Sequence, residues 1–257
     1  MSRVRLVAAD LDGTLVGPDR QLDAGMRRAV GHLRGRRILL IIATGRMFCS
    51  ARRYAEELGN ADTPLIAYNG AWVAVPASGE VLYRRSLSGE LARRLLRRLA
   101  GYHLQAYQDD QLFVRELNER AREYALTFRV QARVADLEDL APAGFSKLQV
   151  IDTPEIIARL LGELRGEGWE ATVTRSSGVF LEIMAPGVSK GEALADLLKR
   201  WRIAPGQVLA AGDGDNDLPL FRLAGQSVAM AEGSQAARTA AGQVLPREEL
   251  AAFLAVL

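Results

Sequence analysis

Cysteine and histidine are scarce in this chain. Its 257 residues include one cysteine, Cys49, and two histidines, His32 and His103, which have no partner at a metal-ligand spacing. A single cysteine excludes an intrachain disulfide and a zinc site built from several cysteines. We interpret both histidines as structural or surface residues. The scarcity of cysteine is typical of a protein of the reducing cytosol, so we expect a cytoplasmic location.

Long hydrophobic runs and an excess of charge of one sign are also missing. The longest apolar stretch, Ile38 to Ala43, is far too short to span a bilayer. The first residues lead straight into a strand pattern and show no signal-peptide pattern. The 33 basic residues face 31 acidic residues, a formal net charge of +2. We therefore expect no membrane and no nucleic acid as a partner, and no obligate protein partner is evident.

A pair of aspartates marks the first candidate site. Asp10 and Asp12 stand in the segment Asp-Leu-Asp-Gly-Thr at residues 10–14, directly after the apolar run Val4 to Ala9. A spacing of two lets both carboxylates face one side where a buried strand gives way to a loop. Two like charges so close repel each other unless a cation or a transferable proton accompanies them. The alternative is a surface turn, because Asp and Gly are common turn residues.

Two further segments could bind an anion. Thr44 follows a second apolar run and precedes a helical pattern, so its hydroxyl and the free amides of a helix start would suit a phosphate. The alternative for Thr44 is a plain helix N-cap. Lys190 precedes a predicted helix at 192–201 and is one of only three lysines in the chain. A compact ammonium suits a position shared by a carboxylate and a phosphoryl oxygen better than a planar guanidinium does.

A second acidic segment follows the apolar run Val208 to Ala211. It contains Asp213, Asp215 and Asp217, three carboxylates within five residues. Acidic loops of this kind often bind a hard cation such as Mg²⁺. A solvated turn is the alternative.

These four segments occur in the order of a known family. With them the chain resembles the haloacid dehalogenase superfamily, and specifically its Cof-like hydrolases, which are Mg²⁺-dependent phosphatases with a large cap inserted between the second and third motifs. The resemblance covers essentially the whole chain. It implies that Asp10 is the nucleophile that becomes an aspartyl-phosphate. It also implies that Asp12 is the general acid and base.

The same resemblance implies the binding residues. Mg²⁺ would be held by Asp10, by the backbone carbonyl of Asp12 and by Asp213, with Asp217 as an additional or more distant carboxylate. The groups that would hold the phosphoryl oxygens are the amides of Leu11 and Gly45, the Thr44 hydroxyl, the Lys190 ammonium and the Asn216 amide. The possible substrate-side residues are Arg46, Asn69 and Gly70; a tight turn is the alternative for the last two.

Two segments depart from the family pattern. Residues 231–233 read Ala-Glu-Gly and residues 247–250 read Arg-Glu-Glu-Leu. The departures leave the phosphoryl motifs untouched, but they concern the outer wall of the site and cap closure. For this reason the substrate preferences of relatives are not carried over.

Buried strands alternate with helices at both ends of the chain. We expect strands near 4–9, 37–43, 65–68, 208–211 and 227–230, with helices between them. This pattern predicts an α/β fold with a Rossmann-like, doubly wound parallel sheet. The candidate phosphate residues lie at the carboxyl ends of three of these strands, which is where such sheets bind ligands.

The middle of the chain has a different pattern. From about residue 81 we expect a strand, a helix, two strands joined by a turn at 109–110, a helix, and then a strand, a helix and two strands. Strand pairs joined by short turns predict an antiparallel sheet with helices on one face. We therefore expect a catalytic core of residues 1–80 and 185–257 and an inserted α+β cap of residues 81–184 that selects the substrate. The hinges would lie near 77–79 and 185–187.

These observations predict a Mg²⁺-dependent phosphatase of small phosphorylated metabolites. Sugar phosphates are the first class, and phosphorylated cofactors such as pyridoxal phosphate or flavin mononucleotide are the second. A phosphomutase on the same scaffold is the nearest alternative. A signalling receiver domain uses similar residues, but it phosphorylates an aspartate on its third strand and has no insert. A binding protein without activity would be expected to have lost one of Asp10, Asp12, Lys190 or Asp213, and all four are present.

Overall fold

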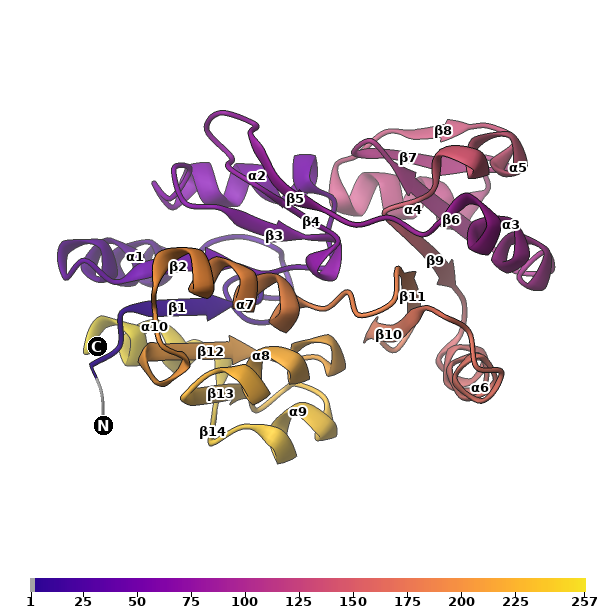
Figure 1. Ribbon diagram of the computed structural model, residues 1–257. Coiled ribbons are helices and arrows are strands. Elements are labelled where there is room, and N and C mark those ends of the chain that lie inside the picture. Colours follow the sequence, from indigo (N-terminus) through magenta and orange to yellow (C-terminus); the bar gives the residue numbers. More distant parts are fainter. Residues whose placement is uncertain (1–2) are drawn as a thin grey trace.

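The computed structural model describes residues 3–257 and contains three sheets (Figure 1). The central sheet has five parallel strands in the order β14-β13-β12-β1-β2. In chain order these strands are β1 (Leu6–Ala9), β2 (Leu39–Ile42), β12 (Val208–Gly212), β13 (Gln226–Met230) and β14 (Gln243–Leu245). The predicted parallel sheet is confirmed, although the sequence pattern did not reveal β14. The strand expected near 65–68 is not one of its five strands, because it pairs in an antiparallel sheet instead.

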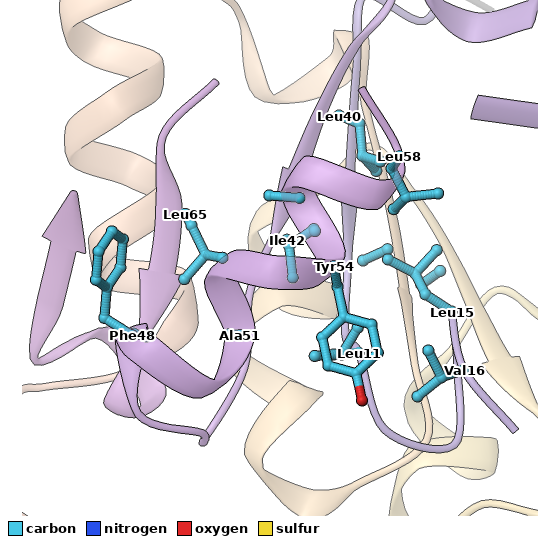
Figure 2. Packing of buried hydrophobic residues seen from close by; sticks show 14 of the residues in the cluster. Leu11, Leu15, Val16, Leu40, Ile42, Phe48, Ala51, Tyr54, Leu58 and Leu65 are labelled. Atoms are coloured by element: carbon cyan, nitrogen blue, oxygen red, sulfur yellow. The ribbon is translucent and has the colours of Figure 1, made fainter. Parts of the chain in front are cut away.

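Helices cover both faces of the central sheet. They are α1 (Ala24–Gly35), α2 (Phe48–Glu57), α7 (Lys190–Trp201), α8 (Leu218–Leu223), α9 (Gln235–Ala240) and α10 (Arg247–Ala255). Alternate strand residues point to opposite faces. Val7 and Leu40 therefore pack on the side of α1, α2 and α10, whereas Leu6 and Ile41 pack on the side of α7 and α8. Figure 2 shows the first face, where Tyr54 of α2 lies beside Leu11 and Leu40 lies beside Leu58. The sheet is doubly wound, as the sequence predicts.

A small antiparallel sheet extends the core. It consists of β3 (Leu65–Ala67), β4 (Trp72–Ala74) and β5 (Val81–Arg84), with β4 in the middle. Residues 77–79 are therefore the turn of a hairpin that joins two paired strands. The hinge expected there is wrong, because β5 completes the hydrogen bonds of the free edge of β4. The chain leaves this sheet only after Arg84.

The middle of the chain forms a six-stranded sheet with the order β10-β11-β9-β6-β7-β8. Its strands are β6 (Leu104–Gln108), β7 (Gln111–Val114), β8 (Ala132–Val134), β9 (Lys147–Ile151), β10 (Thr172–Ser177) and β11 (Phe180–Met184). All pairs are antiparallel except β7 with β8. The turn between β6 and β7 lies at Asp109 and Asp110, both with positive φ, as the predicted hairpin requires.

Helices pack on both faces of this second sheet. Its helical elements are α3 (Gly89–Arg98), α4 (Glu119–Phe128), α5 (Leu137–Leu140) and α6 (Pro154–Gly166), with a short 3₁₀ turn at Ala141–Ala143. Helices α3 and α6 pack on the face that carries Leu104 and Leu148. Helix α4 packs on the opposite face, where Tyr124 contacts Tyr107. The expectation of helices on one face is wrong, because Tyr107 and its neighbours on β7 give that face an apolar patch of its own.

The helices do not suggest a membrane span. None of those in the described part of the chain combines the length and the apolar character that crossing a bilayer requires.

Candidate active site

A buried lysine joins two of the acidic segments. Asp10 follows β1, and its amide donates to the carbonyl of Ala211 on the adjacent strand β12 at 2.9 Å. Lys190 is the first residue of α7, and its ammonium is fully buried. Lys190 Nζ donates to Asp10 Oδ1 and to Asp217 Oδ1, each at 2.6 Å. A buried ammonium with two carboxylates is compensated in charge and fixed in position.

Both oxygens of Asp217 are occupied by protein donors. Oδ1 accepts from Lys190, and Oδ2 accepts from the amides of Asp213 at 3.0 Å and Gly214 at 2.9 Å. Asp217 therefore holds the lysine on one side and the loop after β12 on the other. The same loop brings oxygens of Asp10, Asp213 and Asp217 within 4.8 Å of one another.

This acidic cluster has the chemistry of a hard-cation site. Burial, and after it the charge of the neighbouring Asp217, raise the pKa of Asp213 to about 7 against the opposing effect of Lys190. Burial also raises the pKa of Asp10 well above its usual range. Gly13, with φ +75°, lies against the cluster, and a Cβ there would come 2.3 Å from Asp213 Oδ2. Carboxylates crowded in this way are stabilised by a divalent cation, so the residues present fit Mg²⁺.

Asp12 has a different partner. The guanidinium of Arg46 donates two hydrogen bonds to the Asp12 carboxylate, one of them from Nε to Oδ2 at 2.6 Å. Arg46 is 3% exposed, and its guanidinium lies over the rings of Tyr54 and Phe128, 5.0 Å from each centroid. A planar guanidinium between aromatic rings is held in one orientation, so it holds the carboxylate of Asp12 as well. Arg46 lines the cavity of the site, but its guanidinium already donates to Asp12 and, from Nη1, to the Tyr54 hydroxyl at 3.1 Å.

The Thr44 segment lies in the loop before α2. Helix α2 begins at Phe48 with Met47 as its N-cap, so the plain N-cap interpretation of Thr44 is wrong. The Thr44 hydroxyl is buried, accepts from the Arg46 amide at 3.2 Å and faces the same cavity as Gly45 and Asn216. The side chain of Leu11 points into the core (Figure 2), which leaves only its backbone for the site.

Asn69 links the core to the second sheet. It lies in the 3₁₀ turn Tyr68–Gly70 with φ 54°. Its Oδ1 accepts from Asn216 Nδ2 at 2.9 Å, and its Nδ2 donates to Glu182 Oε2 on β11 at 2.8 Å. Gly70 has φ +103°, and a Cβ there would lie 2.2 Å from the carbonyl oxygen of Ser189, so it permits close contact with the start of α7.

The sequence analysis missed the polar residues of the second sheet. Lys147 on β9 is buried, and its Nζ donates to Glu182 Oε1 at 2.6 Å, to Gln149 Oε1 at 2.8 Å and to the Gly45 carbonyl at 2.9 Å. Burial lowers the pKa of Lys147, and the Glu182 carboxylate opposes this effect. The signal was present, because a lysine, a glutamine and a glutamate stand inside otherwise apolar strands.

The site is a cavity of about 200 Å³ between the two sheets. The core contributes Asp10, Asp12, Gly13, Thr44, Gly45, Arg46, Asp213 and Asn216, together with Arg20. The second sheet and α4 contribute Lys147, Gln149, Glu182, Phe180, Ser176, Ser177, Tyr124 and Phe128.

The two segments that depart from the family pattern lie behind the site. Gly233 packs on the loop of Asp213, and the Ser234 amide donates to the Asp213 carbonyl at 2.7 Å. Arg247 Nη2 donates to the Leu15 carbonyl at 3.2 Å and to Asp23 Oδ2 at 3.1 Å. Both segments support the backbone of acidic loops and contribute no side chain to the cavity.

A doubly wound parallel sheet with buried carboxylates and a lysine near its strand ends, facing a cavity that a second sheet also lines, is typical of a class of Rossmann-like hydrolases. Residues 7–257 match the family of haloacid dehalogenase-like hydrolases, so the chain belongs to this family. It is a Cof-like hydrolase and, within that class, a phosphatase.

Relatives and solved structures agree with this assignment. A phosphoglycolate phosphatase of Methanopyrus kandleri is 32% identical over 247 residues, which cover 95% of this chain and 91% of the relative. An HMP-PP phosphatase of Cronobacter sakazakii is 28% identical over 232 residues, with 88% and 84% covered. A crystal structure from Thermotoga maritima matches with a TM-score of 0.83 at 31% identity, and covers 99% of this chain and 97% of that one.

Proposed function

We propose that the chain is a Mg²⁺-dependent phosphatase of small phosphorylated metabolites, with sugar phosphates as the first class, and that it acts through an aspartyl-phosphate on Asp10. The observation that carries this proposal is the buried Asp10, held at 2.6 Å by Lys190 at the wall of a cavity that Asp12 and Asp213 also line. A nucleophile needs a fixed position, and this lysine and the sheet supply it.

The first step forms a bond between a carboxylate oxygen of Asp10 and phosphorus and breaks the ester bond to the leaving oxygen. Asp12 donates a proton to that oxygen. In the second step water attacks phosphorus, Asp12 accepts a proton from the water, and the acyl-phosphate bond breaks to release phosphate and restore Asp10. The hydrogen bonds from Arg46 hold the Asp12 carboxylate in position for both proton transfers.

The remaining residues hold the phosphoryl group. Thr44, the amides of Leu11 and Gly45, Lys190 and Asn216 are its proposed donors. Mg²⁺, held by Asp10, Asp213 and the Asp12 carbonyl with Asp217 behind them, would neutralise charge on the phosphoryl oxygens. The small size of the cavity supports a small leaving group, and the names of the two relatives, phosphoglycolate and HMP-PP phosphatase, agree with small phosphorylated substrates.

A panel of phosphorylated metabolites tests the proposal. Purified protein with Mg²⁺ should release inorganic phosphate from single monoesters, with sugar phosphates at the top when ranked by kcat/KM. EDTA should abolish the release, and Mg²⁺ should restore it. Release from one monoester as the sole substrate also separates a phosphatase from a phosphomutase. No hydrolysis of the panel or of p-nitrophenyl phosphate would refute the proposed activity.

A further inference from the structure

Gln149 lies in the middle of β9, is 1% exposed and lines the cavity that contains Asp10. Its Oε1 accepts from Lys147 Nζ at 2.8 Å. An ammonium only donates hydrogen bonds, so it fixes the orientation of the amide: the carbonyl oxygen faces Lys147, and the NH₂ group faces elsewhere.

That NH₂ group has no acceptor within residues 3–257. Among the described residues, seven have a buried side-chain polar atom without a hydrogen-bond partner, and Gln149 Nε2 is one of these atoms. Of the seven residues, Gln149 alone lines this cavity. A buried donor without an acceptor is costly to the fold, so its persistence at the wall of a site indicates an acceptor that arrives with the ligand.

The surroundings of this donor are neutral and partly aromatic. The charges of Lys147 and Glu182 compensate each other. The ammonium of Lys147 donates its hydrogen bonds to the Gly45 carbonyl, Gln149 and Glu182. Phe180 and Tyr124 also line the cavity, with their rings 5.8 Å apart. A neutral donor beside a compensated ion pair and apolar rings suits a hydroxyl or carbonyl oxygen on a carbon chain.

We propose that Gln149 is a specificity-determining residue whose Nε2 donates to a hydroxyl or carbonyl oxygen of the leaving group. This assignment rests on the proposed phosphatase function and narrows its substrates to monoesters with an oxygen on the leaving group. Arg20 is a charged donor at the same cavity wall, and it would bind a carboxylate instead.

Matched pairs of substrates test the assignment in the full chain. Glycerol 3-phosphate is compared with propyl phosphate, and ribitol 5-phosphate with pentyl phosphate. The two members of each pair differ only in hydroxyl groups, and the two pairs differ in the length of the carbon chain. The wild type should prefer the hydroxylated member of at least one pair by tenfold or more in kcat/KM. Gln149→Met should remove most of that preference, and Gln149→Glu, which keeps an acceptor for Lys147 but replaces the donor, should do the same.

The ratio of two kcat/KM values from one preparation does not depend on the folded fraction, so partial unfolding of a variant cannot imitate the result. Gln105→Met is the matched control. Gln105 is the cross-strand neighbour of Gln149, but it does not line the cavity, and its Oε1 accepts from Tyr107. This control should leave the ratio at its wild-type value.

The outcomes separate the two proposals. If p-nitrophenyl phosphate is hydrolysed but the wild type shows no preference in either pair, or Gln149→Met keeps the preference, the assignment of Gln149 is overturned while the phosphatase stands. The wild type could instead prefer 2-phosphoglycolate, which carries a carboxylate, over ethyl phosphate. If Gln149→Met removed that preference, the proposal that Gln149 binds a neutral oxygen would be overturned. No hydrolysis of any monoester would refute the phosphatase itself, and the assignment with it.

Discussion

The ammonium of Lys190 compensates two buried carboxylates that would otherwise repel each other. Asp10 and Asp217 are both buried and both lie 2.6 Å from its ammonium. Removal of one partner of such a group leaves an uncompensated buried charge, which costs far more than the pair contributes. A change that keeps size and hydrogen-bonding capacity is therefore the cleanest way to test the chemistry of Asp10.

Asp10→Asn should abolish turnover and leave the fold intact. The amide is nearly isosteric with the carboxylate but is not a nucleophile, so kcat should fall by roughly a thousandfold or more. Steady-state phosphate release measures this, and circular dichroism checks the fold. The exposed Asp62→Asn is the control and should keep wild-type kcat. Retention of a tenth of kcat, a loss of only about 1.4 kcal/mol, would contradict a covalent step on Asp10.

Arg46→Lys should lower kcat by about tenfold to a hundredfold with a smaller effect on KM. Lysine keeps the charge but cannot form the two-pronged contact that orients Asp12, and proton transfer depends on that orientation. Arg53→Lys is the matched control, because Arg53 also stacks on Tyr54, 4.5 Å from its centroid, without a contact to Asp12. Equal effects of the two substitutions on kcat would show that the contact to Asp12 is unimportant.

At the scale of elements, Asp23 joins the two ends of the core. It caps α1 by accepting from the Met26 amide at 2.7 Å, and it pairs with Arg247 at the start of α10 at 3.1 Å. Burial alone would raise its pKa, but the Met26 amide and Arg247 lower it overall.

Asp23→Ala should lower the free energy of unfolding by about 1 kcal/mol at pH 7, the usual value of an N-cap. Because the pKa of Asp23 in the folded protein lies below the ordinary value of 3.8, the stabilisation by Asp23 is present above pH 3.8 and is lost as the pH falls through the folded pKa. Denaturant unfolding at pH 7 and near pH 3 should show the difference between wild type and variant shrink. Asp19→Ala is the control, since the side chain of Asp19 accepts from the nearby amide of Gln21 at 3.0 Å and, in the described part of the chain, has no ion pair. A difference that is the same at both pH values would contradict the role of the ionised carboxylate.

The elements differ in how far the sequence reveals them. Strands β1, β2 and β12 are continuous apolar runs, and the structure places all three in the core. Strands β8 and β14 have short and largely exposed sequences, so no hydrophobic pattern marks them. Contacts between distant residues are hidden for another reason: nothing local in the sequence tells that Arg46 meets Asp12 or that Lys147 meets Gly45, because these pairs are 34 and 102 residues apart.

At the scale of the whole molecule, the second sheet meets the core through both apolar and polar groups. Tyr68 of the core packs on Tyr107 of β6 with their ring centroids 5.8 Å apart, and polar contacts surround this pair. Lys147 donates to Gly45, Arg175 pairs with Asp215 at 2.9 Å, and Asp110 accepts from the Tyr68 hydroxyl at 2.7 Å and from the Cys49 amide at 2.9 Å. Polar contacts of this kind can exchange for water, which favours a cap that opens and closes over the substrate. The division into a catalytic core and a cap that selects the substrate remains a prediction. Because β5 pairs with β4 of the core, a deletion that tests this division must begin after β5.

The last prediction concerns a chain without the cap. Residues 86–186 are replaced by a short Gly/Ser linker. The Nη1 atom at the end of the Arg85 side chain lies 3.5 Å from the Cβ position of Gly187, so the two backbone ends lie within the reach of one arginine side chain. This variant retains β5 on β4, and every proposed phosphoryl and metal residue lies outside the replaced segment. It should fold, as circular dichroism and size-exclusion chromatography would show, and should hydrolyse p-nitrophenyl phosphate with Mg²⁺. Its kcat/KM for the preferred metabolite should fall much further, because the contacts to the leaving group are gone.

A second deletion, of residues 81–184, tests where the boundary lies. It also removes β5 and exposes the edge of β4, so it should be less stable than the deletion of 86–186. If the folded 86–186 variant keeps the substrate ranking of the full chain, the second sheet is not the element that selects the substrate. In that case specificity must come from the core side of the cavity, where Arg20 and Arg46 are the remaining candidates.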